Sequence, residues 1–208
     1  MPEVDLDPRA AHHAAMGSGS NKVRIIAGRW RGRKLSFPDA QGLRPTPDRI
    51  RETLFNWLQP VLPGARCLDL FAGSGALGFE AASRGAAQVV MVDSAPEVVR
   101  ALRANAERLS ASSLQIKRQD AAACLAGVSA PFDVVFLDPP FSNPAVLLQS
   151  ITGLSVPGRL ADGAWIYVEA PAADAGPPVP AGWAPEKQKQ AGQVAYRLYR
   201  YTARAGAS

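Results

Sequence analysis

An acid, two prolines and an aromatic residue follow directly after an apolar run in VVFLDPPF (134–141). The apolar run favours a strand, whereas two successive prolines continue neither a strand nor a helix. Because neither proline carries an N–H, Asp138 and the Pro139 carbonyl would present hydrogen-bond acceptors only. The ring of Phe141 could stack on a flat substrate. The candidate catalytic residues are therefore Asp138, Pro139, Pro140 and Phe141.

Three glycines in DLFAGSGALG (69–78) satisfy the spacing GxGxxG between an apolar strand and a helix. Asp93 closes the next strand 20 residues after Gly73, where a carboxylate would hold ribose hydroxyls. Taken alone, this pattern also suits NAD. Asp69, however, lies before the first glycine, where it would repel a pyrophosphate but would attract an ammonium and a sulfonium. The stretch therefore favours S-adenosylmethionine as the cofactor.

A third acid, Asp120, ends the next predicted strand, LQIKRQD (114–120), and is followed by the small residue Ala121. Its carboxylate could read an adenine amino group, with room for the ring beside Ala121. Asp120 could equally be the N-cap of the helical segment that follows, and the two roles are compatible. The candidate cofactor-binding residues are Asp69, Phe71, Ala72, Gly73, Gly75, Asp93, Asp120 and Ala121.

Strand-like and helix-like periods alternate through the middle of the chain, which predicts a parallel sheet with helices on both faces. Ligands of such sheets bind at the carboxyl ends of the strands, near the crevice where the strand order reverses. All the acids named above would lie at that edge. Strands are expected over 65–72, 88–93, 114–120, 132–138 and 163–170, and helical segments over 75–85, 95–110, 121–127 and 143–154.

Further elements are expected on both sides of this unit. Before it, Thr46 is expected to cap a helix that begins at Pro47 and ends before Pro60. After it, a proline-rich loop precedes an antiparallel hairpin over 183–202, which would close one sheet edge. On its second strand, one face would carry Val194, Tyr196 and Leu198, and the other Arg197, Tyr199 and Tyr201.

Positive charge is concentrated in one short segment. Residues 22–51 hold nine Lys or Arg against two acids, a net charge of +7, whereas residues 52–208 are neutral. This favours a nucleic-acid contact over a merely solvated edge. Three alternating arginines would share one strand face, with Trp30 either stacking on a base or anchoring a small core. The candidate nucleic-acid-binding residues are Lys22, Arg24, Arg29, Arg31, Arg33, Lys34, Arg44 and Arg49.

The composition argues against several other classes of protein. No apolar run approaches the roughly 18 residues of a membrane span, and the acidic N-terminus does not resemble a secretion signal. The only histidines are His12 and His13, so neither histidine catalysis nor a metal site is expected. Cys67 and Cys124 lie in apolar stretches without metal-site spacing, which favours buried thiols in a reducing cytoplasm.

The succession LDLFAGSG, VD, QD and LDPPF resembles the class I methyltransferases that modify exocyclic amino groups of bases, whose signature is [DNS]PP[YFW]. RIIAGRWRGRKL, RPTPDRIRETLFNWL and KQKQAGQVAYRLYRY are further similar to the bacterial methyltransferases that make N2-methylguanine in 16S ribosomal RNA. This resemblance covers residues 23–202. It implies a Rossmann-like α/β fold with a mostly parallel seven-stranded sheet, an antiparallel C-terminal hairpin strand, and a small N-terminal basic β-ribbon and helix.

We accordingly expect a disordered tail over residues 1–21, a basic RNA-binding extension over 22–45 and a methyltransferase domain over 46–208. The exocyclic amine of guanine is a weak nucleophile, so Asp138 and the Pro139 carbonyl would hold its N–H groups while its lone pair faces the sulfonium methyl. Phe141 would stack on the extruded base.

The resemblance also implies a partner, 16S RNA in a partly assembled small ribosomal subunit, for a cytoplasmic monomer. Four alternatives remain open. The chain could be an adenine-N6 DNA or RNA methyltransferase, a protein glutamine methyltransferase, a noncatalytic RNA-binding protein on this fold, or a nicotinamide dehydrogenase.

Overall fold

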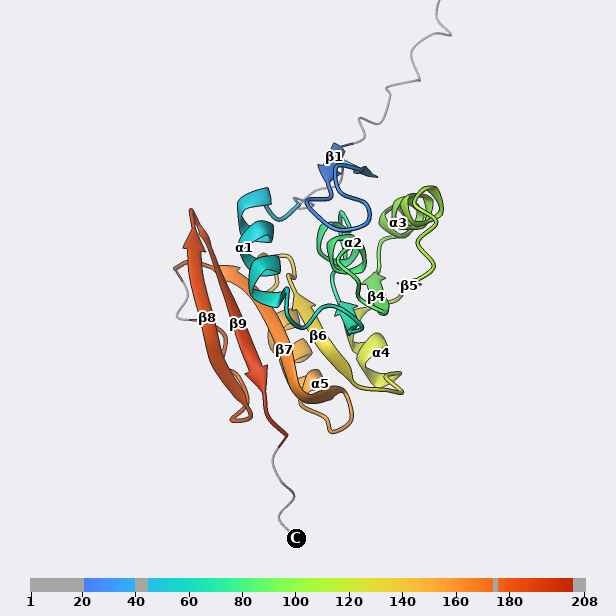
Figure 1. The fold of residues 1–208 in the computed structure, drawn as a ribbon. Coiled ribbons are helices and arrows are strands. Elements are labelled where there is room, and N and C mark those ends of the chain that lie inside the picture. Colours follow the sequence, from blue (N-terminus) through green and yellow to red (C-terminus); the bar gives the residue numbers. More distant parts are fainter. Residues whose placement is uncertain (1–20, 40–44, 174–175, 204–208) are drawn as a thin grey trace, which may run out of the picture.

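The computed structural model describes residues 21–39, 45–173 and 176–203 (Figure 1). The predicted disordered tail therefore lies outside the described residues, apart from its last residue. The strands are β1 (Asn21–Arg24), β2 (Lys34–Phe37), β3 (Arg66–Asp69), β4 (Gln88–Asp93), β5 (Leu114–Arg118), β6 (Phe132–Leu137), β7 (Leu160–Pro171), β8 (Trp183–Ala191) and β9 (Val194–Tyr201). The helices are α1 (Asp48–Leu58), α2 (Ala76–Ser83), α3 (Pro96–Arg108), α4 (Ala121–Ala126) and α5 (Pro144–Leu154).

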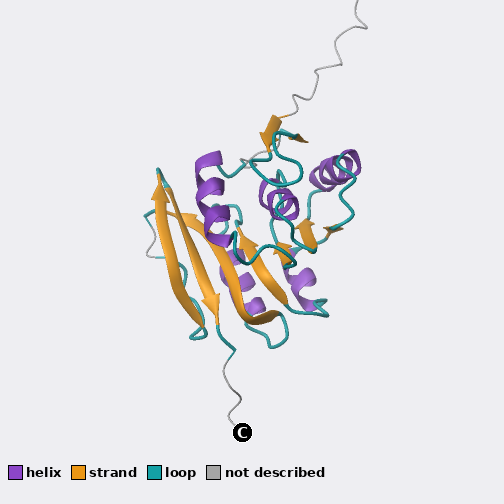
Figure 2. Cartoon of the chain, in the orientation of Figure 1, coloured by secondary structure: helices purple, strands orange, loops and turns teal. Residues whose placement is uncertain are grey.

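One seven-stranded sheet has the order β5-β4-β3-β6-β7-β9-β8. The pairs from β5 through β7 are parallel, whereas β9 runs antiparallel to both of its neighbours. Helices α1, α2 and α3 pack on one face of this sheet, and α4 and α5 pack on the other (Figure 2). The predicted α/β fold, with its mostly parallel sheet and antiparallel C-terminal hairpin, is confirmed.

Strand β4 illustrates why these apolar runs become central strands. Val89 and Met91 point into the core beneath α2 and α3, while Val90 and Val92 point into the core beneath α4 and α5. A strand covered on both faces needs apolar residues at every position, in contrast to the alternating pattern of a half-exposed strand. At the carboxyl end of this strand Asp93 is half-buried, whereas the four residues before it are buried.

The predicted basic β-ribbon is present, but its arginines are not placed as predicted. Strands β1 and β2 form a short ribbon, and Arg29, Arg31 and Arg33 lie in the turns between them rather than on one strand face. Gly28 and Gly32, with φ of 79° and 81°, allow these turns, because positive φ is readily adopted by glycine. The three arginines are nevertheless all exposed.

Trp30 anchors this loop. Its side chain is 6% exposed and belongs to the core shared with α1, α2 and α3, which settles its role in favour of packing. The hydroxyl of Ser83, at the end of α2, accepts a hydrogen bond from the Trp30 N–H at 2.9 Å and donates one to the Ala27 carbonyl at 2.6 Å. The loop is therefore docked on α2 by both packing and hydrogen bonds.

Glu80 makes a second attachment from the same helix. It is fully buried, and its two carboxylate oxygens accept hydrogen bonds from the backbone N–H groups of Ile26 at 2.7 Å and Ala27 at 3.0 Å. The same carboxylate pairs with Arg84 at 2.8 Å and with the buried Arg51 of α1 at 3.7 Å. One buried charge thus joins α2, α1 and the loop between β1 and β2.

Thr46 does not cap α1 as predicted. Helix α1 begins at Asp48, its N-cap is Pro47, and no side chain caps it. The hydroxyl of Thr46 instead lies 3.3 Å from Asp138, to which it donates a hydrogen bond. A tertiary contact therefore takes the place of the local cap.

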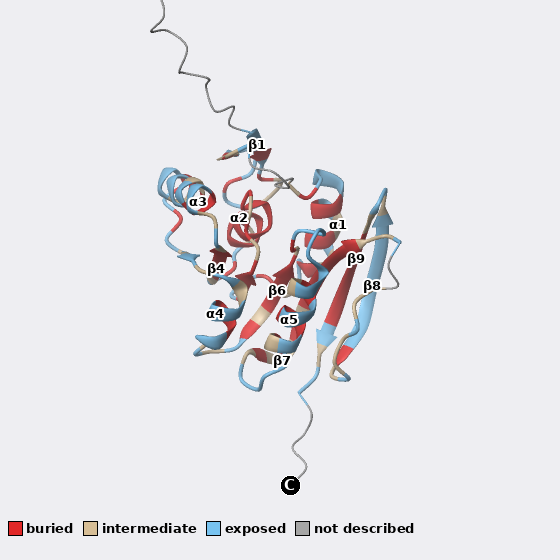
Figure 3. Ribbon diagram, turned by 180° about the vertical axis from the view of Figure 1, so that it is seen from behind, coloured by how far each residue is buried: buried red, intermediate tan, exposed pale blue. Residues whose placement is uncertain are grey.

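The C-terminal hairpin follows its predicted alternation. Tyr196 and Leu198 point into the core beneath α1, whereas Tyr199 points into the opposite core, with Val194 and Tyr201 packed at their margins. Strand β8 lies at the edge and is mostly exposed, while its neighbour β9 is mostly buried (Figure 3). Both cysteines are free and buried, as expected. Within the described residues, no helix is long and apolar enough to span a membrane.

Candidate active site

Five acidic residues lie at the carboxyl ends of five neighbouring parallel strands. In sheet order they are Asp120 after β5, Asp93 on β4, Asp69 on β3, Asp138 after β6 and Glu169 on β7. The strand order reverses between β3 and β6, the place where open parallel sheets bind ligands. All five acids line one cavity of about 1700 Å³.

This cavity contains nearly all the predicted catalytic and cofactor-binding residues. All four residues of the Asp-Pro-Pro-Phe turn line it, and so does every predicted cofactor residue except Gly75. A single drug-sized ligand occupies roughly 300 to 1,000 Å³. The cavity is therefore large enough for two neighbouring ligands, such as a cofactor and a base.

The glycine-rich turn shapes one wall of the cavity. Gly73 and Gly75 have φ of 47° and 80°, and Gly75 is the N-cap of α2. A Cβ on Gly75 would lie 2.7 Å from the side chains of Leu102 and Phe79, so this glycine permits close packing rather than ligand contact. The backbone of the turn at the half-buried Gly73 lines the cavity, where a ligand could contact it.

Asp93 and Asp69 both hold this turn. The two oxygens of Asp93 accept hydrogen bonds from the N–H groups of Gly73 at 3.1 Å and Ala95 at 2.9 Å. Asp69 accepts one from Gly78 at 2.9 Å. Burial, reinforced by the charge of Asp93, raises the pKa of Asp69 to about 7 despite the opposing effect of its backbone hydrogen bonds. Each oxygen retains a further lone pair that a ligand could use.

Asp120 has the capping role that the sequence allowed. It is the N-cap of α4, and its carboxylate accepts a hydrogen bond from the Ala123 N–H at 2.7 Å. Asp120 is exposed and lines the cavity together with Ala121. A cap of this kind leaves its second oxygen open toward the cavity, which is compatible with the predicted contact to an adenine amino group.

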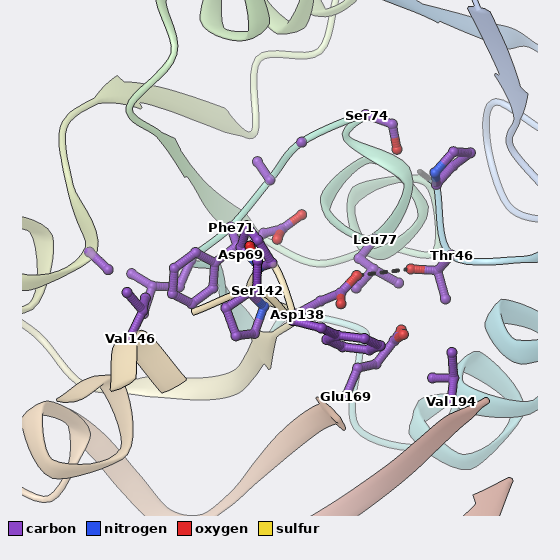
Figure 4. A pocket seen from close by; sticks show the side chains of 18 of the residues that line it. Thr46, Asp69, Phe71, Ser74, Leu77, Asp138, Ser142, Val146, Glu169 and Val194 are labelled. Atoms are coloured by element: carbon purple, nitrogen blue, oxygen red, sulfur yellow. Dashed lines mark hydrogen bonds between the residues drawn. The ribbon is translucent and has the colours of Figure 1, made fainter. Parts of the chain in front are cut away.

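Asp138 lies where the cavity passes from the glycine turn toward α1. Figure 4 shows its carboxylate with those of Asp69 and Glu169 in the same part of the cavity, and with the hydroxyl of Thr46 hydrogen-bonded to it. Burial raises the pKa of Asp138 well above its ordinary range, and the charges of Glu169 and Asp69 raise it further, while the Thr46 hydrogen bond acts in the opposite direction. Phe141, three residues on, is 40% exposed at the cavity.

Two polar residues near Asp138, Thr46 and Glu169, were not predicted from the sequence. Glu169 is 4% exposed, and its Oε1 accepts a hydrogen bond from the Tyr167 hydroxyl at 2.6 Å. Burial also raises its pKa. The rule that identified the other four acids, an acid at the carboxyl end of a predicted strand, applies equally to Glu169 in GAWIYVEA. No comparable signal indicated that Thr46 would contact Asp138.

The predicted RNA-binding residues lie apart from the cavity. Lys22, Arg24, Arg29, Arg31, Arg33, Lys34 and Arg49 are all exposed, and none of them lines it; Arg44 lies outside the described residues. Residues 45–47 connect the two regions. They line the cavity, and Arg49 of the basic segment lies two residues after them in the sequence. A long ligand on the basic segment could therefore reach the cavity past the start of α1.

Comparisons with known proteins agree on one family. The family model described as "Conserved hypothetical protein 95" matches residues 23–200. "Ribosomal RNA small subunit methyltransferase D" from Escherichia coli strain K12 is 50% identical over 182 residues, which are 88% of this chain and 91% of that protein. The protein of the same name from Haemophilus influenzae is 44% identical over 187 residues, which cover 88% of this chain and 95% of that protein. A solved Escherichia coli structure, "Putative methyltransferase yhhF", matches with a TM-score of 0.83 and 47% identity, over 88% of this chain and 100% of that one.

Proposed function

Because the chain belongs to the conserved hypothetical protein 95 family, together with the ribosomal RNA small subunit methyltransferase D proteins, we propose that it methylates 16S ribosomal RNA. The methyl group comes from S-adenosylmethionine and goes to the exocyclic N2 amine of a guanine. The observation that carries this proposal is the position of Asp138-Pro139-Pro140-Phe141 in the same cavity as the glycine turn.

The residues around the glycine turn fit S-adenosylmethionine. Asp93 offers carboxylate oxygens for the ribose, Asp120 for the adenine amino group, and Asp69 a negative charge toward the ammonium and sulfonium. The cofactor supplies an electrophilic methyl group. Among the described residues no cluster of His, Cys, Asp or Glu could hold a metal ion, and the proposed reaction has no step that needs one.

The Asp-Pro-Pro-Phe turn fits an amine substrate. Asp138 accepts an N–H of the guanine amine and the Pro139 carbonyl accepts the other, so that the nitrogen lone pair is directed at the methyl group. Phe141 stacks on the flipped base. After in-line attack the amine is cationic and acidic, and Asp138 or water takes its proton late.

The basic segment fits the RNA backbone, and we propose residues 22–45 as the RNA-binding extension of the methyltransferase domain at 46–208. The substrate is 16S RNA in a partly assembled small subunit, and the protein binds it in the cytoplasm as a monomer.

Mass spectrometry of 16S RNA nucleosides tests the whole proposal: a strain lacking the protein should lose one N2-methylguanosine and regain it on complementation. Unchanged N2-methylguanosine would overturn the proposed specificity.

Replacing Asp93 with alanine is expected to weaken S-adenosylmethionine binding by about 1 to 3 kcal/mol, because a hydrogen-bonded carboxylate at the ribose is lost. Isothermal titration calorimetry in excess EDTA measures the change. The control is Asp162→Ala, which removes an exposed acid at the start of β7, outside the cavity. Equal affinities in the two variants would remove Asp93 from the proposed cofactor site.

Replacing Arg29, Arg31 and Arg33 together with glutamine is expected to lower the salt dependence of RNA binding by up to about 2 in the slope of log K against log[salt], if each arginine meets a phosphate. S-adenosylmethionine affinity should stay the same, since these arginines do not line the cavity. Filter binding of 16S RNA at several salt concentrations gives the slope. A slope equal to that of the parent protein would show that the three arginines are solvated and contact no phosphate.

A further inference from the structure

Glu169 has no role in the proposed methyl transfer, although it is one of the most buried acids of the cavity. It lies on β7, one residue beyond the point where Leu137 of β6 pairs with Val168, so the parallel register places it abreast of Asp138. The Tyr167 hydroxyl occupies its Oε1. Figure 4 shows its side chain directed toward the part of the cavity that holds Asp138 and Thr46. Two carboxylates of neighbouring strands thus face the same space.

These carboxylates need hydrogen-bond donors that the protein supplies only sparingly. Among the residues that the structure describes, the ion pairs involve Asp48 and Glu80, and none involves Asp138 or Glu169. Their described side-chain donors are the neutral hydroxyls of Thr46 and Tyr167. Burying a charge without donors is costly. Burial raises the pKa of both groups for this reason, and a ligand rich in N–H groups would relieve the cost.

We propose that Glu169 accepts a hydrogen bond from N1–H of the target base while Asp138 accepts one from its N2 amine, so that the pair of carboxylates selects guanine. This inference rests on the proposed function and adds the residue that reads the base. It concerns specificity rather than methyl transfer itself. Glu169 is therefore a substrate-binding residue beside the reacting amine.

The chemistry of the purine edges explains the selectivity. Guanine carries N1–H and N2–H donors side by side, which match two acceptors on adjacent strand ends. Adenine and 2-aminopurine each have a bare N1 lone pair next to the amine, and an ionised carboxylate facing that lone pair would repel it. A site with a buried polar group rejects a ligand that leaves the group unpaired far more strongly than an apolar pocket rejects a poor fit.

The parent protein provides the first test. Small subunits are reconstituted from 16S RNA in which the modified guanosine is either kept or replaced by 2-aminopurine, which retains the N2 amine but lacks N1–H. Single-turnover methyl transfer to guanosine is expected to be at least ~10-fold faster, since one hydrogen bond to a charged group is lost and a repulsion appears. Equal rates on the two substrates would overturn the inference.

The variant Glu169→Gln provides the second test. Its amide can donate to the bare N1 of 2-aminopurine. The ratio of the rate on guanosine to the rate on 2-aminopurine should therefore fall to about one or below. The ratio within one variant cancels any general loss of activity, and calorimetry with S-adenosylmethionine checks folding. The control is Asp162→Asn, the same change on the same strand outside the cavity, which should keep the parental ratio.

The outcomes distinguish failure of the proposed function from failure of the role of Glu169. If the parent protein methylates no guanine at N2, the proposed function fails. If it methylates guanine at N2 but Glu169→Gln keeps the parental preference, the proposed function stands and only the role of Glu169 is wrong. If Glu169→Gln does not fold, the parent protein still tests the inference, because equal rates on the two bases would overturn it.

Discussion

Replacing Asp138 with alanine is expected to lower single-turnover methyl transfer by a factor of ~100 or more while leaving S-adenosylmethionine affinity nearly unchanged. The cofactor is assigned to the strand ends of β3, β4 and β5, on the other side of the point where the strand order reverses. In the proposed mechanism Asp138 instead orients the amine and takes its proton late. Quench-flow measurement with one turnover of labelled cofactor gives the rate, and calorimetry gives the affinity.

Two comparisons make this result decisive. Asp138→Asn keeps one acceptor oxygen and should therefore retain more activity than alanine. In the parent protein the rate should rise with pH through a pKa above the usual aspartate value, because burial raises that pKa and only the anion can take a proton. If both variants transfer methyl groups at the parental rate, the turn is structural and the mechanism is wrong.

Replacing Glu80 with alanine is expected to lower the free energy of unfolding by about 3 to 5 kcal/mol, the range found when one partner of a buried ion pair is removed. The carboxylate accepts the N–H groups of Ile26 and Ala27 and pairs with Arg51 and Arg84. Its loss leaves two half-buried donors unpaired and removes an anion from beside the buried Arg51. Urea unfolding followed by circular dichroism measures the change.

The matched control is Glu52→Ala, since Glu52 is an exposed acid on α1 and surface changes of this kind usually stay within about 0.5 kcal/mol. Glu80→Gln should behave like the alanine variant, because one amide oxygen cannot replace two carboxylate oxygens at these donors. A further sign of the same loss would be faster proteolysis between β1 and β2. Equal stability of the Glu80 and Glu52 variants would show that Trp30 and Ser83 hold the loop without Glu80.

The acids at the strand ends show what the sequence could predict. Asp69, Asp93 and Asp138 each follow an apolar run, and Asp120 ends the strand-like stretch LQIKRQD. The rule for parallel sheets places such residues at one edge without further information. Glu169 obeys the same rule, but no motif follows it, and β7 continues for two more residues to Pro171. An acid inside a strand carries a weaker signal than an acid at a proline turn.

The N-terminal segment shows why other features could not be predicted. Alternating arginines favoured a strand, but Gly28 and Gly32 turn the chain, and the packing of Trp30 against α2 fixes those turns. Thr46 has the residue type of a helix cap, yet its hydroxyl contacts Asp138, 92 positions away. In both cases a contact that is distant in sequence outweighs a local preference, and no local pattern records such a contact.

The position of β9 has a consequence for how the protein is made. Within the described residues it is the last strand in chain order, yet it lies inside the sheet, between β7 and β8. During synthesis β7 and β8 must therefore wait, with no strand between them, until Val194–Tyr201 has left the ribosome. Non-local pairing of this kind is slow and leaves strand edges open in the meantime. Glu169 of β7 pairs with Tyr196 of β9, so the wall of the cavity beside the proposed base site is completed only by this late step. A nascent chain ending before β9 should therefore bind no RNA base at that site.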